Sequence, residues 1–154
     1  LGGQGNLWTE AVPNNRHAEY MTWPRGLALA ETFWSQKQNR NWSDFTRRME
    51  WQFQRMDAAQ VKYARSAYDA IISAVKSSDD SLKVKLETEI PGIDIYYTFD
   101  GTNPDNFYPV YEGSPLDIPT GASEIRVITY RDGKPVGKQI NFMLAGLKSR
   151  LPKS

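Results

Sequence analysis

The spacing of apolar residues changes near residue 65 of this 154-residue chain. Before that point apolar residues recur every three or four positions, as they do on one face of an α-helix. After it they alternate with polar residues, as they do in a strand with one buried face. The pattern therefore predicts two parts, a helical one at 1–65 and a β-rich one at 66–154.

The first part begins with a segment that we interpret as the end of a short buried strand, at residues 4–8. The following stretch, "TEAVPNNRHAEY", carries Pro13, Asn14 and Asn15, which are typical of a loop. A proline inside a helix costs about 3 kcal/mol, so Pro24 is predicted to be the first residue of a helix that runs through "RGLALAETFW". The apolar face of this helix consists of Leu27, Ala30 and Trp34.

A second helix is predicted to begin near Ser43, whose side chain suits the N-cap position. Asp44 would then lie in the first turn, where the helix dipole favours a negative charge. Apolar residues recur along this helix at intervals of three or four, which predicts a packing stripe made of Phe45, Met49, Phe53 and Met56.

The second part contains the most regular alternation in the chain, "LKVKLETEI". It predicts a half-buried antiparallel strand whose inner face carries Leu82, Val84, Leu86, Thr88 and Ile90. Pro-Gly and Asp-Gly pairs separate the further runs "DIYYTF", "SEIRVITY" and "KQINFML", "RDGKPVG" is predicted to form a hairpin turn, and "KSSDDS" a polar turn. These spacings predict an antiparallel β-sandwich of about six or seven strands, like those of immunoglobulin and fibronectin domains. The fold class is therefore α+β.

Composition and charge narrow the possible partners. The net charge is +1, from 19 basic and 18 acidic residues, which gives no global field for nucleic acid or an anionic membrane. Basic residues do gather around Trp51, but Glu50 and Asp57 interrupt them, so we interpret a solvated helix face with local ion pairs at Arg47, Arg48, Arg55, Lys62 and Arg65. The chain has no cysteine, which excludes disulfides and thiolate metal sites and is compatible with an oxidising compartment. It also has no apolar run of the length that spans a membrane.

Trp8 and Glu10 are the candidate binding residues. If Trp8 lies at a strand end, a period of two places both side chains on one side. An indole can face the apolar C–H surface of a pyranose while a carboxylate accepts hydrogen bonds from its hydroxyls. The spacing alone favours the other interpretation, a core tryptophan and a solvated loop glutamate.

A longer set of motifs resembles one enzyme family. The segments "GGQGNLWTE", "EYMTWPRGLALAETFWS", "DFTRRM" and "VKYARSAYD" resemble the end of the catalytic barrel in the family-20 glycoside hydrolases, the β-N-acetylhexosaminidases. The stretch "IYYTFDGTNPDNFYPVY" resembles the small β-sandwich that follows this barrel in chitobiase-like members. Relatives often have glycine at the position of Gln60, and this difference concerns the end of the second helix.

The resemblance implies that residues 1–65 are the last strand and C-terminal helices of a (β/α)8 barrel and that residues 66–154 are a C-terminal sandwich. It implies that Trp8 lines the pocket for a terminal N-acetylhexosamine and that Glu10 binds its outer hydroxyls. The small residues of "GGQG" would allow the backbone to pack closely. No metal or organic cofactor is implied, and the expected partner is a glycan.

In this family the catalytic carboxylates form an Asp-Glu pair, and the chain contains no Asp-Glu dipeptide. We therefore expect the catalytic pair to precede this chain in a longer parent enzyme, and the chain alone to be inactive. For the parent, the resemblance implies hydrolysis of terminal β-linked N-acetylglucosamine or N-acetylgalactosamine. The absence of cysteine is compatible with a periplasmic or extracellular location of the parent and does not determine it.

Other interpretations remain open for several residues. Tyrosines at positions 96, 97, 108, 111 and 130 could form a platform of a non-catalytic carbohydrate-binding module or could pack within the sandwich. Apolar helix faces through Trp23, Leu27, Trp34 and Phe45 could form a protein-interaction surface, including one between copies of the chain. The only histidine, His17, is predicted to lie in a solvated loop. Calcium at Asp100, Thr102 and Asp105 is not predicted, because the loop lacks the regularity of such sites.

Overall fold

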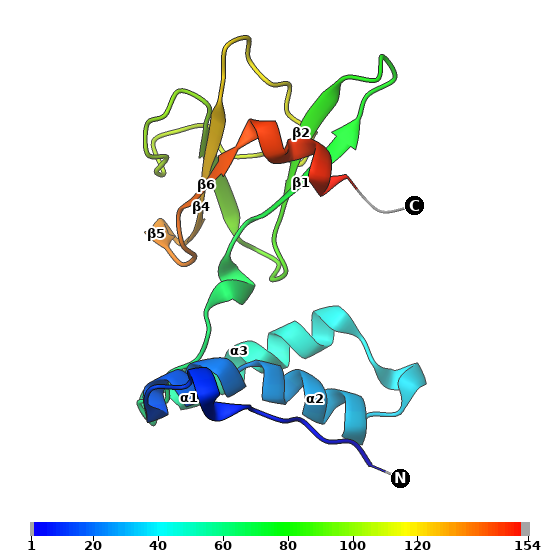
Figure 1. Cartoon of the computed structure of the whole chain (residues 1–154), viewed down its shortest axis with the longest axis vertical. Coiled ribbons are helices and arrows are strands. Elements are labelled where there is room, and N and C mark those ends of the chain that lie inside the picture. The colour runs from blue at the N-terminus through cyan, green and yellow to red at the C-terminus, as the bar shows by residue number, and fades with distance from the viewer. Residues whose placement is uncertain (1, 152–154) are drawn as a thin grey trace. The chain divides into compact units, whose positions relative to one another are not determined.

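The computed structural model describes residues 2–151. The chain divides into two compact units, Leu1–Ala64 and Arg65–Ser154. The first is helical and the second is built from antiparallel strands, so the predicted α+β class is confirmed (Figure 1). None of the helices within residues 2–151 has the length and apolar character needed to cross a membrane.

The first unit contains three α-helices within its described residues: α1 (Asn15–Thr22), α2 (Arg25–Trp34) and α3 (Trp42–Ala58). Two short 3-10 turns, η1 (Thr9–Ala11) and η2 (Lys37–Asn39), precede α1 and α3. Helix α2 begins one residue later than predicted, because Pro24 is its N-cap and Arg25 its first residue.

The region around α1 was predicted as a loop, and this prediction is wrong. The Asn14 side chain accepts a hydrogen bond from the backbone N–H of His17 at 2.9 Å and so caps the helix. The polar cluster Pro13 to Asn15 therefore marks the beginning of a helix, because asparagine is favoured at N-caps as well as in loops. His17 consequently lies in α1.

Helix α3 begins slightly earlier than predicted. Asn41 is its N-cap, with a side-chain oxygen that accepts the N–H of Asp44 at 2.9 Å, so the assignment of Ser43 as the cap is wrong. The predicted stripe is confirmed at Phe45, Met49 and Phe53, which are buried, whereas Met56 is only half-buried. Phe53 stacks on the buried ring of Tyr63, with centroids 4.3 Å apart.

The end of α3 explains why Gln60 is unusual. Gln60 has a φ of 56°, in the left-handed region that favours glycine. The resemblance predicted glycine at this position, and glycine adopts this backbone conformation without strain. The helix nevertheless ends here, and the backbone N–H of Gln60 donates to the carbonyl oxygen of Asp57 at 3.1 Å.

The second unit contains two antiparallel sheets. Strands β1 (Ile71–Lys76) and β2 (Leu82–Glu87) pair with each other. In the other sheet β4 (Glu124–Arg131) pairs with β3 (Asp94–Thr98) on one side, and with β5 (Lys134–Pro135) and β6 (Ile140–Met143) along different parts of its length. The Asp132-Gly133 pair between β4 and β5 has positive φ at both residues, 51° and 70°, so the predicted hairpin turn is confirmed.

Both sheets contribute to one hydrophobic core. Val84 and Leu86 of β2, which are 0% and 2% exposed, share a cluster with Ile125 and Val127 of β4, both 0% exposed. The 3-10 segment η4 (Leu144–Arg150), which the pattern did not predict, adds Leu147 to this cluster. Strand β2 ends at Glu87, earlier than expected, but the buried alternation continues to Ile90. The arrangement is a β-sandwich, as predicted.

Candidate functional site

Trp8 and Glu10 do not lie on a strand. Residues 2–8 have no regular secondary structure, Trp8 caps the 3-10 turn η1, and Glu10 lies within that turn. The predicted strand at residues 4–8 is therefore wrong for this chain. A strand needs a partner for its backbone hydrogen bonds, and among the described residues none pairs with this segment.

The local conformation does not support the placement of Trp8 and Glu10 on one side by a period of two. Period two requires an extended backbone, whereas a 3-10 turn has about three residues per turn. Both side chains are exposed, and the Trp8 residue is 74% exposed. Their cooperation in a sugar pocket stays a prediction that rests on the family resemblance.

The glycine-rich segment before Trp8 packs against α2. A β-carbon at Gly3 would lie 2.0 Å from the ring of Phe33, and one at Gly5 would lie 2.6 Å from a methyl group of Leu29. A side chain at either position would require the ring of Phe33 or the methyl group of Leu29 to move. The expectation of close backbone packing in "GGQG" is thus confirmed, and it fixes how the chain approaches Trp8.

Helix α1, which follows the Trp8 segment, is held by the chain beyond α3. A carboxylate oxygen of Glu19 accepts the backbone N–H of Lys62 at 2.7 Å. The carbonyl oxygen of Trp23 accepts the N–H of Ala64 at 2.9 Å. These bonds connect residues about 40 positions apart in sequence. Helix periodicity relates only residues three or four positions apart, so it could not predict them.

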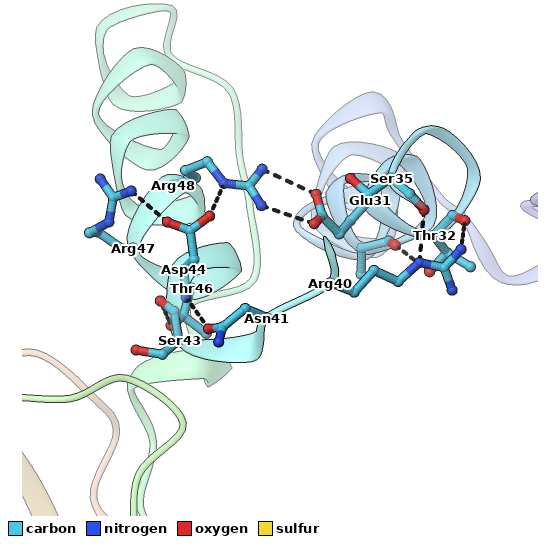
Figure 2. Close-up of polar contacts among 11 residues, drawn as sticks. Glu31, Thr32, Ser35, Arg40, Asn41, Ser43, Asp44, Thr46, Arg47 and Arg48 are labelled. Atoms are coloured by element: carbon cyan, nitrogen blue, oxygen red, sulfur yellow. Dashed lines mark hydrogen bonds and ion pairs between the residues drawn. The ribbon is translucent and has the colours of Figure 1, made fainter. Parts of the chain in front are cut away.

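A charged network connects α2 and α3 (Figure 2). The guanidinium of Arg48 donates two bonds to Glu31 of α2, at 2.9 and 3.1 Å, and a third to Asp44 at 2.9 Å. Arg47 donates to the other oxygen of Asp44 at 2.5 Å. The expected local ion pairs are therefore present at these two arginines, and the link to Glu31 is an addition that helix periodicity did not predict.

The network also shifts the ionisation of Glu31. The hydrogen bond from Arg48 lowers the pKa of the Glu31 carboxyl. A lowered pKa in the folded state means that the pair stabilises the fold above the ordinary glutamate pKa and that this stability is lost as pH falls through the lowered value.

We expect Glu31→Gln to lower the unfolding temperature of the helical unit by a few degrees at pH 6, and the difference from the wild type to shrink below about pH 4. Melting followed at 222 nm by circular dichroism measures this, because the three α-helices of residues 2–151 lie in the first unit. Glu112→Gln, at an exposed position of the second unit, is the control. A difference that stays constant between pH 6 and pH 3 would contradict this role for the pair.

The apolar faces of the helices differ from the expectation in part. Trp34 is 89% exposed and borders a groove of 510 Å³ between α2 and α3, which Leu27 and Trp51 also line. Phe45 was predicted to contribute to an exposed surface, but it is only 7% exposed because it belongs to the inner stripe of α3.

The tyrosines of the second unit do not form a coplanar row. Tyr96 meets Tyr130 edge to face at an interplanar angle of 81°, and Tyr97 meets Tyr111 at 84°. Tyr97 and Tyr111 pack against the core cluster. These four rings therefore pack edge to face within the sandwich and do not form a coplanar platform. Across residues 2–151 no group of three or more His, Cys, Asp or Glu side chains is arranged to hold a metal ion.

Comparisons with known proteins find similarity in both units of the chain. Residues 1–37 match the catalytic domain of glycosyl hydrolase family 20, and this range includes Trp8 and Glu10. Residues 84–144 match a family described as Fn3 associated. The chain is 30% identical over 139 residues to a beta-hexosaminidase of Porphyromonas gingivalis, in an alignment that covers 84% of this chain and 17% of the relative.

These matches follow the order of the motifs, with the barrel-like segment first and the sandwich after it. They also follow the structure, because the first match ends within the helical unit and the second lies within the β-sandwich unit. The first unit is therefore similar to part of the catalytic domain of glycosyl hydrolase family 20, and the second unit contains a segment similar to the Fn3-associated family.

Proposed function

We propose that this chain is part of a β-N-acetylhexosaminidase, an enzyme that removes terminal β-linked N-acetylglucosamine or N-acetylgalactosamine from the non-reducing ends of glycans. The observation that carries the proposal is the family-20 match over residues 1–37, which contains the Trp8-Thr9-Glu10 stretch. The similarity to a beta-hexosaminidase over 84% of the chain supports it.

Trp8 and Glu10 have complementary roles in this proposal. The exposed indole of Trp8 offers a flat apolar wall to the C–H face of the sugar. The carboxylate of Glu10 accepts hydrogen bonds from the outer hydroxyls, and such charge-assisted bonds are worth about 1.5 to 3 kcal/mol each. Closure of the pocket requires the remainder of a barrel, because the segment that carries both residues lacks strand partners within residues 2–151.

The reaction we propose is substrate-assisted and retains the anomeric configuration. The acetamido oxygen of the sugar attacks its own anomeric carbon while the glycosidic bond breaks, and an enzyme glutamic acid gives its proton to the leaving oxygen. A neighbouring aspartate orients the acetamide. We place this Asp-Glu pair in a part of the enzyme outside these 154 residues, because the sequence contains no such dipeptide.

The 154-residue chain alone is therefore expected to be inactive. We propose to compare it with a longer protein that contains it, at equal concentration, on an aryl β-N-acetylglucosaminide. The longer protein should release the chromophore, whereas the chain alone should give no release above the uncatalysed rate. Specific release by the purified chain would contradict the placement of the catalytic pair, and no release by the longer protein would contradict the proposed function itself.

A further inference from the structure

The loop after β3 is held in place by its own polar contacts. The buried hydroxyl of Thr98 donates to the carbonyl oxygen of Thr102 at 2.6 Å. One carboxylate oxygen of Asp100 accepts both the backbone N–H and the hydroxyl of Thr102, at 3.0 and 2.5 Å. The first half of the loop is thus fixed to the end of the strand.

The second half of the loop is fixed in the same way. The Asp105 side chain accepts the N–H of Phe107 at 2.9 Å, and its carbonyl oxygen accepts the N–H of Tyr108 at 3.2 Å. The amide oxygen of Asn103 accepts bonds from Arg126 at 2.8 Å and Gln139 at 2.9 Å. A loop ordered before binding loses little conformational entropy on meeting a ligand.

This loop forms one wall of a hollow of 450 Å³, a volume within the range of small-molecule sites. Three aromatic residues line it, Tyr97, Phe99 and Tyr108, together with the acidic side chain of Asp100. The segment 119–122 also lines the hollow. Tyr97 and Phe99 come from the end of β3 and the residue after it, so strand and loop both contribute.

The hydrogen bonds determine which polar atoms are left for a ligand. Thr102 gives its single hydroxyl hydrogen to Asp100, so in the 2.9 Å contact between the Thr102 and Tyr108 hydroxyls the tyrosine is the donor. The phenol oxygen of Tyr108 can then accept further bonds. The second carboxylate oxygen of Asp100 has no donor among the described side chains and is also an acceptor.

The ionisation of Asp100 is consistent with its role as a hydrogen-bond acceptor. Hydrogen bonds from Thr102 lower the pKa of the Asp100 carboxyl, and the positive charge of Arg126 acts in the same direction. The group is therefore an ionised acceptor at neutral pH. An ionised carboxylate accepts hydrogen bonds from hydroxyl groups, and Arg126 contributes only its positive charge, since its own hydrogen bonds go to Glu124 and Asn103.

We propose that the hollow between Asp100, Tyr108 and the segment 119–122 binds one neutral pyranose unit of a glycan, separately from the proposed catalytic site. A pyranose has an apolar face that suits the aromatic lining and hydroxyl groups that suit the free acceptors of Asp100 and Tyr108. In the longer enzyme of the proposed function, the second unit would then hold a glycan on which that enzyme acts. The binding proposal does not depend on the proposed hydrolysis.

The test is a titration of the ¹⁵N-labelled 154-residue chain with chitotriose, followed by NMR. We expect shifts at residues 97–108 and 119–122. Shifts at residues 8–10 alone would overturn the second-unit site and would leave the proposed hydrolase function standing. If the longer protein releases no chromophore, the proposed hydrolase function fails, but shifts at residues 97–108 and 119–122 would still support the sugar site in the second unit. Stronger shifts at residues 97–108 with tetramethylammonium than with chitotriose would overturn the sugar as the ligand class.

Two substitutions locate the site. Asp100→Asn keeps an oxygen for the Thr102 bonds but removes the charge, and we expect chitotriose binding to weaken about 10-fold. Tyr108→Ala removes an aromatic wall, and we expect a loss of at least about fivefold. Asp100→Asn should still fold, because the amide oxygen can accept the same bonds from Thr102. Unchanged binding in Asp100→Asn and Tyr108→Ala, with native spectra, would overturn the proposal.

Matched controls come from aromatic residues outside the hollow. Phe107 is adjacent to Tyr108 in sequence but is 91% exposed and does not line the hollow, and Trp51 is 61% exposed in the first unit. Phe107→Ala and Trp51→Ala should bind chitotriose within about twofold of the wild type. If Phe107→Ala loses as much affinity as Tyr108→Ala, an exposed ring rather than the hollow holds the sugar, and the proposed site is overturned.

Discussion

Replacement of Glu10 by Gln in the longer enzyme is expected to lower turnover of an aryl β-N-acetylglucosaminide by about 10-fold to 1000-fold. The physical reason is the loss of charge-assisted bonds to the sugar hydroxyls, which corresponds to about 1.4 to 4 kcal/mol. Gln has the size of Glu and still accepts through its amide oxygen, so the change tests the negative charge rather than the space that it fills. Steady-state kinetics with the wild type and the variant measure the effect.

The control for this substitution is Glu112→Gln in the same protein. Glu112 is exposed and lies in the second unit, so its variant should retain wild-type kinetics. Equal thermal stability of the two variants would show that a loss in Glu10→Gln comes from the site. Kinetics of Glu10→Gln that equal those of the wild type would remove Glu10 from the sugar pocket.

Replacement of Ile125 by Ala is expected to destabilise the β-sandwich by about 2 to 5 kcal/mol. Ile125 is 0% exposed and lies on β4 within the core that the two sheets share. Its truncation removes buried apolar contact and leaves a cavity, because a packed core relaxes only partly around the missing atoms. The expected loss is a large fraction of the stability of a domain of this size.

Urea unfolding measures this loss if the probe reports the second unit. The five tryptophans lie at positions 8, 23, 34, 42 and 51, all in the first unit, so tyrosine signals or amide resonances of the strands are the appropriate probe. Ile71→Ala is the matched control, because Ile71 also lies on a strand but is 38% exposed. We expect this control to cost less than about 1 kcal/mol. Equal losses in the two variants would contradict the core position of Ile125.

The candidate site could be predicted from the sequence only through the resemblance of its motifs. The Trp8-Thr9-Glu10 stretch falls within the family match, so the motif identified the relevant segment. The strand geometry used to place Trp8 beside Glu10 is not present, since a lone extended segment has no backbone partner among residues 2–151. The hollow at Asp100 and Tyr108 was not predicted either, because it depends on a loop folding back beside segment 119–122.

Local patterns in the sequence alone determined the stripe of Phe45, Met49 and Phe53, the inner face of β2 and the Asp132-Gly133 turn. Each of these depends on residues within a few positions of one another, where helix and strand periods or positive φ impose the pattern. Only the tertiary structure decided the bond between Arg48 and Glu31, the burial of Leu147 and the two partners that β4 has on one edge. These arrangements join residues far apart in the chain. They form because packing of the backbone buries distant apolar faces against each other and brings opposite charges within bonding distance.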